Sequence, residues 1–215
     1  MHIPDGILPI TVCTAGYAVT GAATWYSLRK INQQADPRAS IPKAALLTSA
    51  FFVASWIHIP VPPVSVHLIL NGLMGVILGW YAFPAILVGL FFQAIMFNHG
   101  GLTTLGVNAA MMGLPALAAY GVFQLRYKFG GDALSTVTRF AFLGGAMGLG
   151  LAAAIAFPIL IYTIPGNIDA AAERVSITSL MLAHVPLMFI EGIFTAMLVS
   201  FLHRVKPELI KAMAT

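Results

Sequence analysis

Long apolar runs separated by short polar links dominate this sequence and predict a bundle of membrane-spanning helices. A spanning helix needs about 20 mainly apolar residues. There is no sign of a second domain, a repeat or a low-complexity tail. Single runs of suitable length predict helices over residues 8–27, 43–59, 105–123, 140–162 and 179–202.

The apolar run from Val64 to Phe97 is too long for one helix. At about 1.5 Å per residue it would far exceed the hydrocarbon core of roughly 30 Å. Pro84 is a natural break, because proline suits the first turn of a new helix. The run therefore predicts two short helices, over 66–81 and 84–97, which brings the expected total to seven.

Composition supports a membrane protein. The 215 residues are 59% hydrophobic and 8% charged, with a mean hydropathy of +0.90, whereas a soluble domain has roughly 25% charged residues. A cleavable signal peptide is not expected, and the single Cys13 excludes an internal disulfide. The net charge of +4 is attributed to membrane topology, so no nucleic-acid partner is expected.

Basic residues predict the orientation, because cytoplasmic loops carry an excess of Lys and Arg. With the N-terminus outside and the C-terminus inside, only Arg174 falls on the outer side. We therefore expect an all-α membrane protein of seven helices. It forms a single domain, with an N-terminal metal-binding segment 1–7, a bundle 8–202 and a cytoplasmic tail 203–215. The inner basic residues are Arg29, Lys30, Arg38, Lys43, Arg126, Lys128, Arg139, Arg204, Lys206 and Lys211.

Histidines gather on the outer side of this predicted topology, and only His203 falls on the inner side. A neutral histidine bonded to a backbone carbonyl is common, so each has a purely structural alternative. That alternative is favoured for His58, His99 and His184. The outer histidines are His2, His58, His67, His99 and His184.

The first six residues, Met1-His2-Ile3-Pro4-Asp5-Gly6, carry the most specific chemistry. Met1 is expected to remain, because initiator methionine is normally trimmed only before a small residue. Its amine, the deprotonated amide of His2 and the near ring nitrogen of His2 then close two chelate rings around one cation. A square-planar ion such as Ni(II) or Cu(II) would still need a fourth donor. An ordinary frayed terminus is the alternative.

His67 is the strongest candidate for that fourth donor. It is expected at a helix start after a rigid Pro-Pro link, with Asn71 one turn further along the same face as support for the imidazole. Asp5 either binds metal or, as we favour, ties down the terminal loop.

Two further features leave alternatives open. Glu191 is a carboxylate inside a spanning helix, where it is expensive; it is either a protonated or hydrogen-bonded structural group or a site that controls neighbouring helices or a subunit contact. Small residues at helical spacing let backbones approach closely, for internal packing or for docking another membrane subunit. These stripes are Gly144, Gly148 and Ala152, and Thr14, Ala18 and Ala22.

Three sequence blocks together resemble the NikM/CbiM family, the nickel- and cobalt-binding S-components of energy-coupling factor (ECF) transporters. The blocks are the first six residues, VHLILNGL at 66–73 and HGGLTTLGVN at 99–108. The resemblance spans nearly the whole chain. It implies a six-helix core with an extra N-terminal helix, and a terminus that inserts into the core and binds metal from outside.

The resemblance also implies a ligand set, formed by the Met1 amine, the His2 amide and imidazole, and the His67 imidazole. The Pro4-Asp5 pair resembles nickel members more than cobalt members. Candidates that hold the loop or support the ligands are Ile3, Asp5, Asn71, His99 and Asn108.

The expected function is capture of Ni(II), or alternatively Co(II), outside a prokaryotic plasma membrane for ATP-driven uptake. The ion is cargo, and neither a catalytic residue nor a cofactor is expected. The sequence contains no P-loop, so energy must come from partners, which the resemblance implies are a transmembrane coupling (T) subunit and two ABC-type ATPase subunits. No fused module is expected after Leu202, so a small accessory membrane subunit would be a separate chain.

Two other classes of function stay open. A membrane metalloenzyme would need an open coordination position and a general base; Asp5 alone is close enough, and no HExxH motif occurs. A haem-binding electron-transfer subunit would need paired histidines such as His58 and His184.

Overall fold

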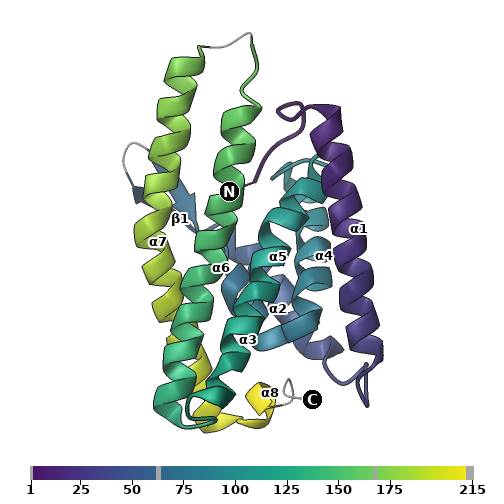
Figure 1. Cartoon of the computed structure of the whole chain (residues 1–215), viewed down its shortest axis with the longest axis vertical. Helices are drawn as coiled ribbons and strands as arrows, with labels where there is room; N and C mark the ends of the chain where they lie inside the picture. The colour runs from purple at the N-terminus through teal and green to yellow at the C-terminus, as the bar shows by residue number, and fades with distance from the viewer. Residues whose placement is uncertain (1, 62–63, 167–168, 212–215) are drawn as a thin grey trace.

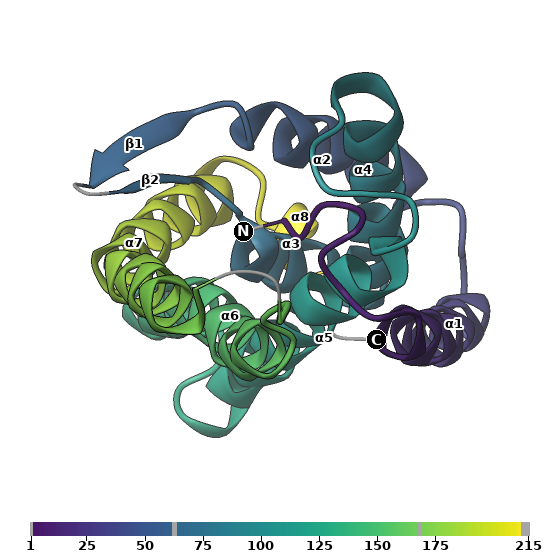
Figure 2. The same ribbon diagram turned by 90° about the horizontal axis from the view of Figure 1, so that it is seen from above.

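A computed structural model describes residues 2–61, 64–166 and 169–211 and is predominantly helical. Most helices run along the long axis, and the N-terminal segment lies towards the end opposite α8 (Figure 1). Seen along that axis, the segment crosses from α1 towards the middle of the bundle (Figure 2). The elements are α1 (Ile10–Asn32), α2 (Ile41–Ala54), β1 (His58–Val61), β2 (Val64–His67), α3 (Asn71–Leu78), the 3₁₀ helix η1 (Gly79–Tyr81), α4 (Ala82–Phe97), α5 (Leu105–Gln124), the 3₁₀ helix η2 (Leu125–Lys128), α6 (Leu134–Tyr162), α7 (Ala170–Val205) and α8 (Glu208–Lys211).

The short helix α3 is the centre of the bundle. Every one of its residues is buried, and it packs against α4, α5, α6 and α7. Its approach to α6 depends on glycine: a Cβ added to Gly148 would lie 2.4 Å from the Cα of Gly72. The small-residue stripe predicted on the sixth helix therefore serves internal packing.

Four helical stretches among the described residues are long and apolar enough to cross a membrane. The helix α1 is not one of them, and α2 is a shorter apolar helix. The predicted helical membrane fold is confirmed to that extent, whereas seven spans and their orientation stay predictions. The four stretches are Asn71–Phe97, Leu105–Lys128, Leu134–Tyr162 and Ala170–Val205.

The predicted break within the run 64–97 is present. It falls at Gly79, where φ is 58°, a conformation that favours glycine. The next helix, α4, begins at Ala82 and carries Pro84 in its first turn, as predicted.

A β-hairpin between α2 and α3 was not predicted. Helices were expected over 43–59 and 66–81, but α2 ends at Ala54 and α3 begins at Asn71. Between them β1 and β2 pair antiparallel, with His58 opposite His67. β-branched residues alternate along both strands, and a short apolar run of this kind does not distinguish a strand from a helix.

The helices α6 and α7 begin earlier than predicted, at Leu134 and Ala170 rather than at 140 and 179. The side chain of Asp169 caps α7 by accepting hydrogen bonds from the amides of Ala171 (2.9 Å) and Ala172 (3.2 Å). Hydropathy marked only the apolar part of each helix. The added turns of α7 and the C-terminal turns of α6 reach past the other helices (Figure 1) and lie beside the N-terminal segment.

The glycine contact between α3 and α6 predicts a specific sensitivity to side-chain size. Gly148→Leu forces the two backbones apart and should cost about 1–3 kcal/mol of stability or more, seen as a lower thermal midpoint in detergent. Gly21→Leu is the matched control, because a Cβ there meets nothing within 4 Å. Equal midpoints for the two variants would contradict the packing account.

Candidate metal site

The backbone of Ile3 is held by the side chain of Asn108 at the start of α5. The Ile3 amide donates to Asn108 Oδ1 (3.0 Å), and Asn108 Nδ2 donates to the Ile3 carbonyl (3.0 Å). Thr104 Oγ1 donates to the same carbonyl at 2.6 Å. Ile3 itself is 3% exposed. The N-terminal segment is therefore folded back into the protein at this residue.

Asp5 anchors the same segment two residues further along the chain. Its carboxylate accepts hydrogen bonds from the amides of Leu102 (3.1 Å) and Thr103 (2.8 Å) and from the Thr103 hydroxyl. The hydroxyl bond from Thr103 is the largest cause that holds the pKa of Asp5 below its ordinary value; burial is the next largest and opposes it, and the amide bonds add to the lowering. A Cβ on Gly101 would lie 2.1 Å from Asp5 Oδ1, so this approach requires glycine. In this position the carboxylate is tied to the loop before α5.

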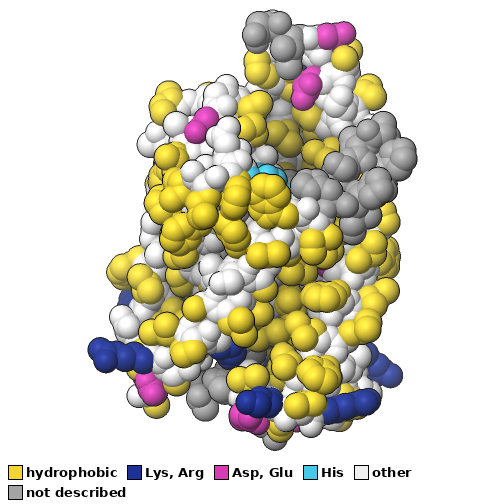
Figure 3. Space-filling model, turned by 180° about the vertical axis from the view of Figure 1, so that it is seen from behind, with side chains coloured by type: hydrophobic (Ala, Val, Ile, Leu, Met, Phe, Trp, Pro, Cys, Tyr) yellow, Lys and Arg dark blue, Asp and Glu magenta, His cyan; other side chains and the backbone are white. Residues whose placement is uncertain are grey.

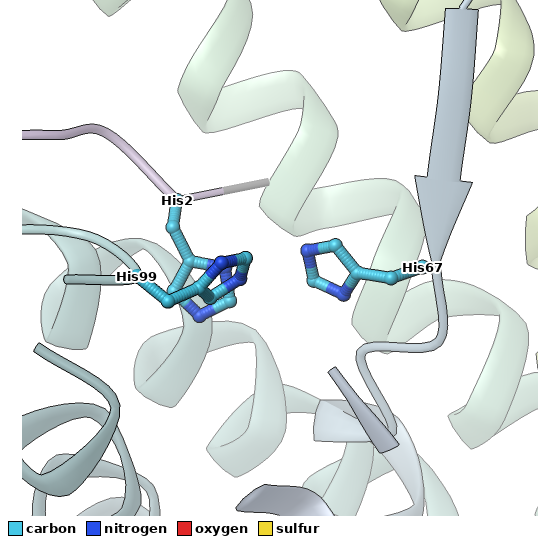
Figure 4. Close-up of side chains that lie close together, drawn as sticks. All are labelled: His2, His67 and His99. Atoms are coloured by element: carbon cyan, nitrogen blue, oxygen red, sulfur yellow. The ribbon is translucent and has the colours of Figure 1, made fainter. Parts of the chain in front are cut away.

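Three histidines from distant parts of the chain meet below this loop. His2 comes from the N-terminal segment, His67 from the end of β2 and His99 from the link between α4 and α5 (Figure 4). Ring centroids lie 5.1 Å apart for His2 and His67 and 4.1 Å apart for His2 and His99. Their ligand nitrogens all lie within 4.8 Å of one another. Metal–nitrogen bonds of about 2.0–2.1 Å would draw opposite donors to about 4 Å, a small contraction.

Hydrogen bonds define the tautomer of two of the rings. His67 Nδ1 lies 3.0 Å from the Leu68 carbonyl, which only accepts, so Nδ1 carries the proton and Nε2 the lone pair. His2 Nε2 lies 2.9 Å from Gln93 Oε1, and His2 Nδ1 is buried without a hydrogen-bond partner among the described residues. The ring nitrogen of His2 nearer its own backbone is thus the one left for a ligand.

His2 is held in the neutral state in which imidazole binds metals. Burial is the largest effect, followed by the positive chain terminus and the neighbouring His99 and His67, and together they set the pKa of His2 well below its ordinary value. The hydrogen bond to Gln93 acts in the opposite direction but is outweighed. A proton therefore competes weakly for this ring.

Gln93 and Ser55 were missed from the sequence. Gln93 is fully buried in α4, and its Nε2 donates to Ser55 Oγ at 3.0 Å. The available signal was a single amide inside an otherwise apolar helix of membrane depth, which needs a partner there. Histidines and carboxylates alone were considered as candidates, so this amide was missed.

Glu191 holds the turn that follows His67. Its Oε1 accepts hydrogen bonds from the amides of Ile69 and Leu70, the latter at 3.1 Å. Leu70 has a φ of 58°, which is unusual for a branched side chain. The carboxylate is 1% exposed and reaches across from α7, so the hydrogen-bonded structural role foreseen for it is the one seen here.

Asn71 lies elsewhere than predicted. Because His67 ends a strand, helical spacing does not set Asn71 beneath its ring, and that reasoning was wrong. The Asn71 amide instead donates to the carbonyls of Gly148 (2.9 Å) and Met112 (3.2 Å). It joins α3 to α5 and α6.

His184 and His203 do not join the described cluster. His184 Nδ1 bonds the Leu180 carbonyl of its own helix at 2.7 Å. His203 lies at the far end of α7. The side chain of His58 and the whole of Met1 fall outside the part of the chain that is described.

A cavity of about 300 Å³ lies beside the cluster, between the N-terminal segment and the upper turns of α6 and α7. His2 lines it, and Glu173 of α7 is the one carboxylate among its described lining residues. Histidine atoms are visible in a hollow on the face shown in Figure 3. The cavity lies at the end of the bundle that carries the N-terminal segment.

Known protein families and proteins resemble this chain along nearly its whole length. The model of the CbiM family, described as the cobalt uptake substrate-specific transmembrane region, matches residues 2–209. This chain belongs to the CbiM family. The family's match includes His2, His67 and His99, the three residues of the cluster.

Relatives of this CbiM-family chain are transport proteins by name. A putative metal transport protein of Haemophilus influenzae is 34% identical over 97% of this chain and 96% of its own. The fused nickel transport protein NikMN of Rhodobacter capsulatus is 30% identical over 98% of this chain and 64% of its own. The crystal structure of a transition metal transporter is 25% identical, covers 99% of this chain and 97% of that chain, and has a TM-score of 0.82.

The Ile3 clamp predicts how the terminus responds to loss of Asn108. Asn108→Leu leaves the buried Ile3 amide unpaired, at about 1–3 kcal/mol. Amide hydrogen exchange over residues 2–6 should then accelerate roughly 5- to 150-fold, as that free energy implies. Asn32→Leu, at the exposed end of α1, is the control. Unchanged exchange in Asn108→Leu would refute the clamp.

Proposed function

We propose that this chain is the substrate-binding membrane subunit of an ECF-type, ATP-driven transporter and captures Ni(II) for uptake. One observation carries the proposal: the second residue of the chain lies in a histidine cluster with its Nδ1 buried and unpaired among the described residues. Nδ1 is the ring nitrogen that chelates together with the amide of the same residue. A frayed terminus would have no reason to bury this group.

The proposed ligands are the Met1 amine, the amide and Nδ1 of His2, and the His67 imidazole. Met1 is joined directly to His2, so rotation about the Met1 Cα–C bond is enough to bring its amine beside the His2 amide and close the first chelate ring. Four nitrogens in one plane favour Ni(II) or Cu(II) over Zn(II), because Zn(II) prefers tetrahedral sites.

Co(II) is the second candidate ion. The ring of His99, 4.1 Å from that of His2 between centroids, supplies a third imidazole to an ion that accepts more than four ligands. The family description itself names cobalt. Competition between the two ions for the purified protein separates them: Ni(II) should displace Co(II) at equal concentration.

Partners are proposed because the chain has no nucleotide-binding loop. A T subunit and two ABC-type ATPase subunits would supply the energy. The stripe Thr14, Ala18 and Ala22 is exposed on α1 and suits close contact with a helix of another chain. The fused name of the Rhodobacter relative, of which this chain covers 64%, supports a small accessory subunit.

We place the protein in a prokaryotic plasma membrane, with the N-terminal segment outside and residues 203–215 in the cytoplasm. Lys and Arg side chains on the face in Figure 3 gather at the end remote from the histidine cluster. That distribution supports the orientation through the positive-inside rule. The ion would then enter through the 300 Å³ cavity.

The chelate predicts a strict requirement for the authentic terminus. His2→Ala, His67→Ala and a single extra residue before Met1 should each abolish Ni(II) binding in calorimetry, because each removes or displaces a donor. His184→Ala, a histidine bonded to its own helix, is the matched control and should bind normally. Intact affinity in the extended protein would refute the chelate.

Affinity should also fall in acid, because the amine and the amide must lose protons on binding. Above the amine pKa of about 7.7–8.0, one proton is released and Kd rises about tenfold per unit fall in pH. Below it, two are released and the slope doubles. The lowered pKa of His2 means that its ring adds no third proton near neutrality. A flat profile between pH 6 and 9 would contradict this proton count.

A further inference from the structure

Gln93 has an orientation that the surrounding hydrogen bonds determine. The Ser55 hydroxyl donates to the Phe52 carbonyl at 2.8 Å, so its single proton is already used. Ser55 Oγ is then an acceptor towards Gln93, and the group of Gln93 that faces it at 3.0 Å must be the NH₂. The Phe52 carbonyl, 3.5 Å from the same nitrogen, is likewise only an acceptor.

The other side of the Gln93 amide therefore presents a carbonyl oxygen to His2. An oxygen acceptor at 2.9 Å requires a proton on His2 Nε2. Every donor and acceptor from Phe52 through Ser55 and Gln93 to His2 has thus one consistent direction. A neutral imidazole with its proton on Nε2 has its lone pair on Nδ1.

We propose that Gln93, oriented by Ser55, is a positioning residue that holds His2 as its Nε2–H tautomer and turns Nδ1 towards the cation. The inference rests on the proposed function, because it assigns a role within that site. A ring with the proton on Nδ1 would have no lone pair on the nitrogen nearest its own backbone amide, and the second chelate ring could not close.

Burial makes the hydrogen bond between Gln93 and His2 important for the position of the His2 ring. Gln93 is fully buried and Ser55 is 4% exposed, so water does not readily replace either partner. The chain of bonds also joins the N-terminal segment to α4 and, through Ser55, to the end of α2. Partners of this kind, one step behind a ligand, typically change metal affinity by 10–100-fold.

The test uses three variants of the full-length protein with its authentic start. Gln93→Leu removes the acceptor at similar volume, and Gln93→Glu keeps an oxygen acceptor. Ser55→Ala removes the hydroxyl that fixes the orientation of the Gln93 amide, so the amide can flip. Gln33→Leu, at an exposed site at the far end of α1, is the matched control. Two quantities are measured: the Ni(II) Kd, and the ¹⁵N shifts of the His2 ring in metal-free protein, which report the tautomer.

Gln93→Leu should weaken Ni(II) binding 10- to 100-fold and change the His2 ring from one tautomer to a mixture. Gln93→Glu should restore the Nε2–H tautomer, and Ser55→Ala should give an intermediate shift. A purely structural role for Gln93 would alter thermal stability without moving the tautomer.

The outcomes separate this inference from the proposed function. If wild-type protein binds Ni(II) and Gln93→Leu keeps both its Kd and its tautomer, the inference is overturned alone. If wild-type protein binds neither Ni(II) nor Co(II), the proposed function fails, whereas a tautomer change in Gln93→Leu would still support the positioning of His2. If Gln93→Leu does not fold, unchanged ¹⁵N shifts of the His2 ring in Ser55→Ala would overturn the positioning role of Gln93.

Discussion

The pair of hydrogen bonds between Asn108 and the backbone of Ile3 is the interaction on which the rest of the site depends. A chain terminus is ordinarily free to fray, and a chelate built on it would have to order several residues each time an ion binds. Here the folded protein orders them beforehand, with Asp5 bonded to the loop at 102–103 as a second anchor. The conformational cost is met on folding, so affinity for the ion is not reduced by it. His2 inherits its position from these two fixed neighbours.

The half of the site that contains His67 is also held by hydrogen bonds formed on folding. His67 belongs to a hairpin outside the central bundle, and Glu191 reaches from α7 to bind the turn that follows it. Immediately beyond, Asn71 begins the buried helix α3 and bonds α5 and α6. Polar groups buried in an apolar bundle are costly unless paired, and Glu191 and Asn71 are both hydrogen-bonded between the bundle centre and the cluster. His2 Nδ1 is buried without a hydrogen-bond partner among the described residues, which is what a ligand position requires.

Much of this was readable from the sequence, and the failures have physical causes. Apolar run length gave the α5 boundaries within a residue, and Pro84 marked the first turn of α4 correctly. The hairpin escaped because an apolar run of four residues fits either period. His2 was singled out for its chemistry and His67 for its expected position and the family resemblance, and the two do lie together, although His67 ends a strand and does not begin a helix. Gln93 was not foreseen: a lone amide in an apolar helix signals a buried partner, but that partner, His2, lies 91 positions away along the chain, and no local pattern identifies it.

The central claim is that the chain terminus and His67 form one planar set of four nitrogens around Ni(II). The most direct measurement is the absorption spectrum and magnetic susceptibility of protein with an authentic Met1, loaded with one equivalent of Ni(II). The account predicts a yellow, diamagnetic species. A paramagnetic Ni(II) centre in fully loaded protein would contradict the planar set, and with it the role assigned to the terminus.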